Sequence, residues 1–280
     1  SRGLGDVYKR QRRLIMRSYK LPGNRLRLLH PNENRGAVTI DEERDYHFRY
    51  VLEDNFGNRR TYQFIVKGKR QDIPEYKPEA NEMLYWNRTN VIQKPGMELV
   101  VPRYYVYEDV PLRTDMRGDS SHIAFDYILD AGRTPIHSYC DLSIGLRHMP
   151  VADTTKYYIV QKAGKWRSSM GGKYANGWIK TRVRSLGTFS VDVDTIAPQI
   201  TPIGQGGWRT SRNIRFRIKD MESGIGSYKV YIDGKFVLFG LKKGILVIQN
   251  PEKVKKGVSH KLEVTVTDQC GNMTRKEYKF

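Results

Sequence analysis

The histidines of this chain are the first residues to test for chemistry, because histidine is the commonest ligand of catalytic metal ions. The chain has six: His30, His47, His122, His137, His148 and His260. A zinc hydrolase needs histidines that converge on the metal, often as H-x-H or H-E-x-x-H. No two of the six have either spacing. The sequence therefore predicts no catalytic zinc site.

Nucleophilic and nucleotide-dependent chemistry lack their signatures too. No G-x-S-x-G elbow occurs, and the glycine-rich stretch 164–177 lies among predicted strands rather than at a strand-to-helix turn. Cys140 and Cys270 fall in different predicted domains, which argues against a disulfide or a cysteine metal site. A carboxylate pair for glycoside hydrolysis would meet only in space and stays open. We expect no catalytic residue and no cofactor in this segment.

Acidic side chains in predicted turns of the last domain are a second candidate group. Oxygen-rich turns between domains can hold Ca²⁺. Aspartate is also common in turns because its carboxylate accepts a hydrogen bond from the backbone two residues on. We favour the turn role and predict no metal site, while calcium binding by these residues stays open. They are Asp194, Asp220, Glu222, Asp233 and Asp268.

Three aromatic residues in the glycine-rich stretch suggest a third kind of site. Trp166, Tyr174 and Trp178 can form an exposed platform on which a sugar stacks. Alternatively, Trp166 and Trp178 are core residues on the two strands of one hairpin. Large aromatic side chains usually anchor the packing of β-sandwiches, so we favour the core role.

The elements that would position these residues are indicated by a sequence that occurs twice. Residues 47–66 and 262–280 each read as an alternating strand, a D-x-x-G-N turn and a second alternating strand. Such a turn suits a tight hairpin, because Asp bonds its own backbone and Gly and Asn adopt positive φ. A repeated hairpin indicates similar β-domains in tandem. Three pairs of residues align at one offset of 214: Asp54 with Asp268, Gly57 with Gly271, and Asn58 with Asn272.

The remaining strands and turns predict an all-β chain of three tandem immunoglobulin-like β-sandwiches. Short alternating segments separated by Gly, Asp and Pro turns recur throughout, and no long helix-period segment appears. Ala37–Ile40, Tyr104–Tyr107 and Trp178–Val183 are among the expected strands, and Asp233–Gly234 is expected to form a two-residue hairpin turn. The predicted divisions are a non-native leader (1–11), a first sandwich (12–70) that is N-terminally truncated if the leader is non-native, a linker (71–80), a second sandwich (81–193) and a C-terminal immunoglobulin-like domain (194–280).

Composition restricts the partners. The net charge is +19, from 49 Lys and Arg against 30 Asp and Glu, and it is spread along the chain without a dense basic block. Such a surface attracts polyanions, but it lacks the clustered charge of a nucleic-acid arm, so we expect no nucleic acid. The sequence also contains no apolar run long enough for a membrane span. Residues 1–11 (SRGLGDVYKRQ) resemble translated sequencing adapter, so the lack of a signal peptide says nothing about export.

Further motifs carry a resemblance to known families. D-T-x-A-P at Asp194–Pro198, D-x-x-S-G-I at 220–225, D-G-K at 233–235 and D-x-x-G-N at 268–272 resemble a bacterial immunoglobulin-like domain. Together with Gly171–Tyr174, Gly177–Ile179 and Arg184–Phe189, residues 12–280 resemble the region after the catalytic domain in Bacteroidetes lysostaphin-like zinc metallopeptidases. The zinc ligands of that family are absent here, so no catalytic residue carries over.

The resemblance implies a non-catalytic accessory segment of an exported peptidoglycan peptidase, located in the periplasm or cell envelope. It would position the enzyme, whose catalytic domain lies upstream, or bind peptidoglycan or another anionic envelope polymer. The alternative is a surface adhesin or glycan-binding module. Exposure of Trp166, Tyr174 and Trp178 would favour the alternative, and burial of all three would weaken it.

Overall fold

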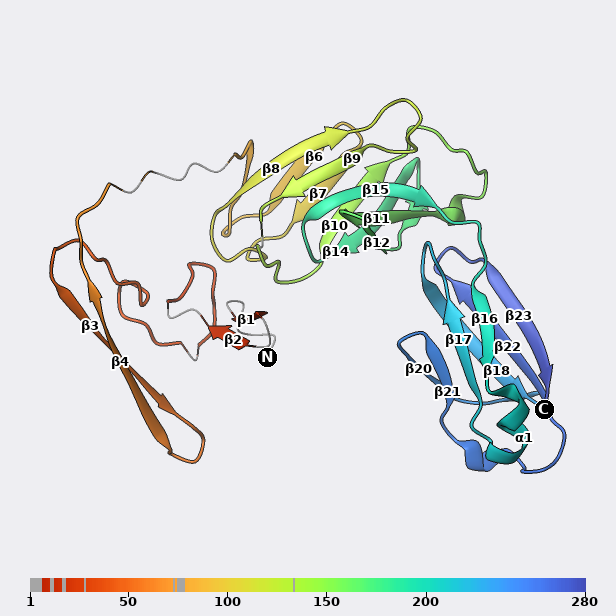
Figure 1. The fold of residues 1–280 in the computed structure, drawn as a ribbon. Helices are drawn as coiled ribbons and strands as arrows, with labels where there is room; N and C mark the ends of the chain where they lie inside the picture. Colours follow the sequence, from red (N-terminus) through yellow and green to blue (C-terminus); the bar gives the residue numbers. More distant parts are fainter. Residues whose placement is uncertain are drawn as a thin grey trace. The chain divides into compact units, whose positions relative to one another are not determined.

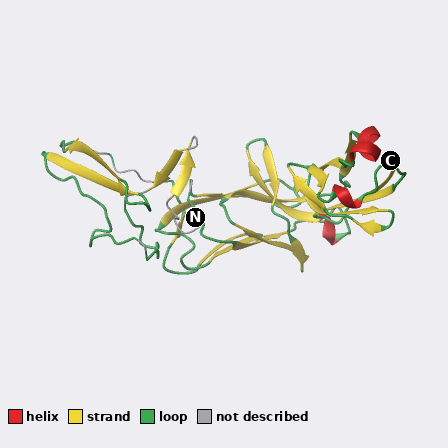
Figure 2. Cartoon of the chain, turned by 90° about the horizontal axis from the view of Figure 1, so that it is seen from below, coloured by secondary structure: helices red, strands yellow, loops and turns green. Residues whose placement is uncertain are grey.

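The fold is given by a computed structural model that describes residues 7–10, 13–16, 19–27, 29–72, 74, 79–132 and 134–280 (Figure 1). The chain divides into two compact units, Ser1–Glu79 and Ala80–Phe280, so the division falls within the predicted linker. Strands dominate and the helical segments are short, which confirms the all-β prediction (Figure 2). None of the helices in the described residues has the length and apolar character that crossing a membrane requires.

The first unit contains two separate hairpins where the sequence predicts a first sandwich. Strand β1 (Val7–Arg10) pairs with β2 (Arg13–Met16), and β3 (Asp45–Glu53) pairs with β4 (Arg59–Lys67). The predicted strand at 37–40 belongs to neither sheet, and its apolar side chains Val38 and Ile40 are exposed. A four-residue segment without a paired neighbour does not form a strand, because its backbone groups have no ladder partner. Of the predicted leader, residues 1–6 and 11 lie outside the described residues.

The hairpin β3–β4 and the C-terminal hairpin of β22 (Lys261–Asp268) and β23 (Met273–Lys279) have the same register. Phe48 pairs with Phe64 as Leu262 pairs with Tyr278, each at the offset of 214. In both turns the first aspartate accepts the backbone N–H groups two and four residues on, and the glycine has φ of +81°. The repeat seen in the sequence is therefore the same hairpin built twice.

The second sandwich stacks two antiparallel sheets. One has the order β13 (Lys173–Ala175), β14 (Trp178–Val183), β10 (Cys140–Gly145), β7 (Met97–Val101) and β6 (Asn90–Lys94). The other has the order β12 (Trp166–Ser169), β11 (Tyr157–Ala163), β15 (Gly187–Val193), β9 (Asp126–Asp130), β8 (Val110–Arg117) and β5 (Glu82–Leu84). Alternate side chains of both sheets, among them Leu99, Leu142 and Phe189, form one buried core.

One predicted strand of this sandwich is a turn instead. Residues 104–107 follow Pro102 and bend away from β7. Tyr104 has φ of +68°, and the Tyr105 N–H donates to the Pro102 carbonyl at 3.1 Å. A left-handed residue so close to the strand end breaks the extended backbone. The aromatic residues of this stretch therefore lie in a loop.

The C-terminal sandwich also has two antiparallel sheets. Their orders are β16 (Gln199–Ile203), β17 (Arg215–Lys219), β21 (Ile245–Ile248), β20 (Phe239–Lys242), and β19 (Lys235–Phe236), β18 (Ile225–Ile232), β22, β23. The predicted two-residue turn at Asp233–Gly234 is confirmed, with φ of +48° and +76°. The short helical segments of the unit Ala80–Phe280 are η1 (Thr154–Lys156) in the second sandwich, and η2 (Gln205–Gly207), α1 (Trp208–Ser211) and η3 (Pro251–Lys253) in the C-terminal sandwich.

Candidate functional site

The outer face of strand β14 carries an aromatic residue followed by two basic ones. Because strand side chains alternate between faces, Trp178, Lys180 and Arg182 share one face while Ile179 and Val183 enter the core. Trp178 is half-buried because it pairs with Gly145, where the missing side chain leaves room for the indole ring. The strand thus presents a ring and two cations side by side.

Beside this row lies a shallow open groove of about 360 Å³. The side chains of Lys173, Lys180 and Arg182 contribute three positive charges to its lining, against one carboxylate, that of Asp141. Among the described residues, these three cations take part in none of the ion pairs. We call this site the basic groove. Its charges favour an anionic ligand. The groove lining is Asp141, Gly172, Lys173, Lys180, Thr181 and Arg182.

The three aromatic residues of the predicted platform are not buried together. Trp166 is 81% exposed on β12, whereas Tyr174 and Trp178 belong to β13 and β14 of the other sheet. Tyr174 pairs with the buried Ile179 and lies on the same face of the sheet as that residue. Trp178 lies on the opposite face. The structure therefore differs from the favoured core role: Trp166 is exposed, Trp178 is only half-buried, and their strands belong to different sheets. It leaves Trp178, beside the basic groove, as the aromatic group best placed to contact a ligand there.

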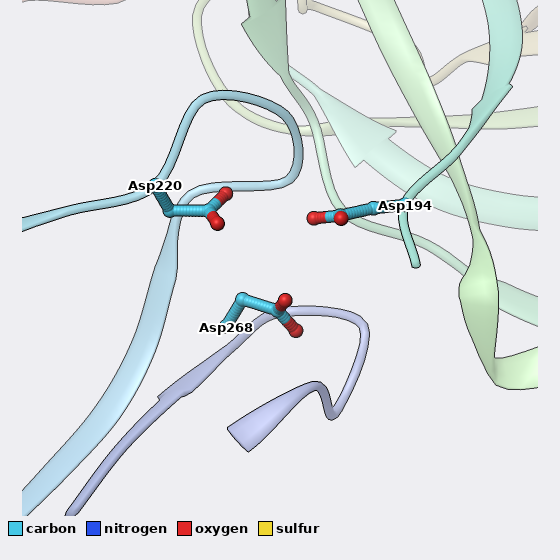
Figure 3. Close-up of side chains that lie close together, drawn as sticks. All are labelled: Asp194, Asp220 and Asp268. Atoms are coloured by element: carbon cyan, nitrogen blue, oxygen red, sulfur yellow. The ribbon is translucent and has the colours of Figure 1, made fainter. Parts of the chain in front are cut away.

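Three of the five turn carboxylates meet at one end of the C-terminal sandwich. Asp194 follows β15, Asp220 follows β17 and Asp268 ends β22, and their side chains point toward one another (Figure 3). One carboxylate oxygen from each lies within 4.8 Å of the others. An all-oxygen donor set of this kind suits a hard cation such as Ca²⁺. The sequence named these three among five candidate acidic residues, and the sheet topology decides which of the five meet.

The hydrogen bonds of these carboxylates also support the turn role that the sequence favours. Asp194, fully buried, accepts from the N–H groups of Ile196 and Ser223. Asp268 accepts from Cys270 N–H, Asn272 N–H and Asn272 Nδ2 at 2.7–2.8 Å. Each carboxylate therefore closes a loop of the backbone.

The other two acidic residues of the predicted group lie apart from this cluster. Glu222 accepts a hydrogen bond from the Tyr158 hydroxyl at 3.3 Å. Asp233 contacts His260 Nδ1 at 2.6 Å, and His260 is nearly buried. Burial acts to lower the pKa of His260. The hydrogen bonds to the Asp233 carboxylate and the Lys255 carbonyl outweigh this effect, so the pKa is raised above its ordinary 6.5. Neither residue is placed to share a cation with the cluster.

Asp220 gives the cluster a pH dependence. Burial raises the pKa of its carboxyl above the ordinary 3.8, and the nearby Asp194 and Asp268 carboxylates raise it further, against the hydrogen bonds from Gly224 and Glu222. The folded protein therefore keeps this proton to a higher pH than the unfolded chain. As pH rises from about 4 through the folded pKa, Asp220 should lower the free energy of unfolding.

An Asp220→Asn variant tests this dependence. We expect the wild type to lose stability relative to the variant as pH rises above about 4, because only the wild type acquires the extra half-buried charge beside Asp194 and Asp268. Urea unfolding of both proteins at a series of pH values measures the difference. Parallel stability profiles would contradict the argument.

Both cysteines are free and buried. Burial raises the pKa of the Cys270 thiol to about 11 and that of Cys140 to about 12. Thiols with such pKa values stay protonated at neutral pH and are poor nucleophiles. Cys270 packs instead with Tyr158 and Val160 of the preceding sandwich.

Comparison with known proteins adds one domain-level match. Residues 81–194, the second sandwich with its basic groove, match the family described as Zu5-like domain. No curated protein matches the chain. The chain is also similar to a solved structure that is described as a Ca²⁺-stabilised adhesin that helps an Antarctic bacterium reach out and bind ice. The identity is 10% over 84% of this chain and 80% of that chain, with a TM-score of 0.21. That likeness is too distant to carry an argument.

Proposed function

We propose that this chain is a non-catalytic binding segment of a surface or envelope protein, and that it holds an anionic polymer in the basic groove. The observation that carries the proposal is the convergence of Lys173, Lys180 and Arg182 beside Trp178 on one face of the second sandwich. Cations attract the polymer's acidic groups, and an adjacent indole stacks on sugar rings. Burial of Trp166, Tyr174 and Trp178 together would have weakened this reading, and Trp166 is exposed.

The test replaces Lys173, Lys180 and Arg182 by glutamine and measures cosedimentation of the protein with purified peptidoglycan sacculi. We expect the variant to lose most of its binding and its salt sensitivity, because screening acts on the charges that have been removed. Arg215, Arg217 and Lys219, three exposed basic residues on β17, provide a control with the same loss of charge when changed to glutamine. Equal losses in both variants would contradict a specific groove.

A second candidate function is the accessory segment of an exported peptidoglycan metallopeptidase. Its support is the set of D-T-x-A-P, D-x-x-S-G-I and D-x-x-G-N motifs, together with the tandem β-domains. Deleting this segment from the parent enzyme would then abolish its wall association while leaving hydrolysis of soluble peptide intact. An upstream reading frame without an H-x-H motif would argue against this parent.

A further inference from the structure

The hairpin β3–β4 has one aromatic face. Tyr46, Phe48, Tyr50 and Leu52 of β3 pair with Val66, Phe64, Tyr62 and Arg60 of β4 on this face, which we call the aromatic face. The rings of Phe48 and Phe64 stack at 5.1 Å between centroids. Yet Leu52 is 61% exposed, and Tyr50 and Tyr62 are exposed as well. The opposite face is more polar and carries Arg49, Gln63 and the Glu53–Arg59 ion pair.

The repeated hairpin in the same chain shows what such a face is built to contact. At the offset of 214, the positions of Phe48, Tyr50 and Leu52 correspond to Leu262, Val264 and Val266. Those three side chains have no exposed surface, because they pack with Phe216 and Leu246 of the facing sheet. The turn and register of the two hairpins are the same. The aromatic face is thus a sandwich inner face, and its natural contact is another β-face about 10 Å away.

We propose that the β-face covering it is the aromatic face of a second copy of this chain. The hairpin Asp45–Lys67 has three acidic and four basic residues, so two hairpins meet with little repulsion although the whole chain carries +19. Arg60, at the end of the face, is its one charged residue. A face that packs on its own copy across a two-fold axis is self-complementary. A two-stranded hairpin is marginal alone, and the second layer would stabilise both.

The edges of the hairpin do not offer an equivalent contact. In-register antiparallel pairing of two β3 strands about Arg49 places Asp45 opposite Glu53 and Arg49 opposite its own copy. The same pairing of β4 about Gln63 places Arg59 opposite Lys67. Like charges directly opposite one another destabilise a sheet. Association therefore runs through the face and forms two stacked layers.

The experiment is sedimentation equilibrium of the full chain from about 1 to 100 µM at physiological salt. The wild type is expected to show a monomer–dimer equilibrium. Leu52→Lys should raise the dissociation constant at least about tenfold, because it adds a second charge beside Arg60 to the layer that the dimer buries. The control is Val51→Lys: Val51 is 50% exposed, adjacent, and on the opposite face, so its dissociation constant should stay close to wild type.

Two further measurements separate loss of the dimer from unfolding of the hairpin in Leu52→Lys. Leu52→Tyr retains an apolar face and should dimerise like the wild type. Thermal unfolding of the unit Ala80–Phe280 should be unchanged in all variants, because the hairpin belongs to the other unit. A wild type that stays monomeric throughout the range, or equal effects of Leu52→Lys and Val51→Lys, overturns the proposal.

Discussion

Replacing Trp208 by alanine is expected to destabilise the C-terminal sandwich by about 3–5 kcal/mol. The indole is fully buried, and its ring centroid lies 5.0 Å from that of Phe216 and 5.9 Å from those of Tyr278 and Phe280. Its Nε1–H donates to the Ile203 carbonyl at 3.0 Å. Alanine would leave a large cavity and a carbonyl without its donor. Calorimetry should show a melting transition lowered by at least about 10 °C.

The matched control is Trp166→Ala. Trp166 is also a tryptophan of the second unit, but most of its surface is exposed on the edge strand β12. Its loss should change the free energy of unfolding by no more than about 0.5 kcal/mol. If Trp208→Ala were as mild as Trp166→Ala, the aromatic cluster around α1 would not be the core that the structure shows.

Replacing Asp268 by alanine is expected to cost about 2–3 kcal/mol. Its nearly buried carboxylate accepts hydrogen bonds from two backbone N–H groups and from Asn272 Nδ2. Alanine leaves the buried Cys270 N–H without that acceptor, and the turn loses the group that closes it. Denaturant unfolding of the unit Ala80–Phe280 measures the loss.

The repeat supplies the control for this change. Asp54 makes the corresponding hydrogen bonds in the turn of β3–β4, but there the turn is exposed and lies in the other unit. Asp54→Ala should therefore leave unfolding of the unit Ala80–Phe280 unchanged. A similar shift in both variants would show that the loss does not come from the turn at Asp268.

Strands and turns were predictable because their signals are local. Alternation in Trp178–Val183 gives the strand with its observed limits, and Asp233–Gly234 gives the two-residue hairpin. The segment Tyr104–Tyr107 was equally strand-like, but a positive φ at Tyr104 ends the extended backbone there. Tertiary contacts decided between strand and loop, since a short apolar segment suits both.

The candidate site divides in the same way. The sequence by itself determined the all-β class, the twin hairpins and the free cysteines, since these depend on residue type and spacing along the chain. The alternation of Trp178, Lys180 and Arg182 also held the signal that these three side chains share one face of the strand. Only the tertiary structure brought Lys173 and Asp141 to that strand, and only it joined Asp194, Asp220 and Asp268 from three elements. The pairing of strands within the sheets sets the distances between these side chains, and the local sequence pattern does not specify which strands pair.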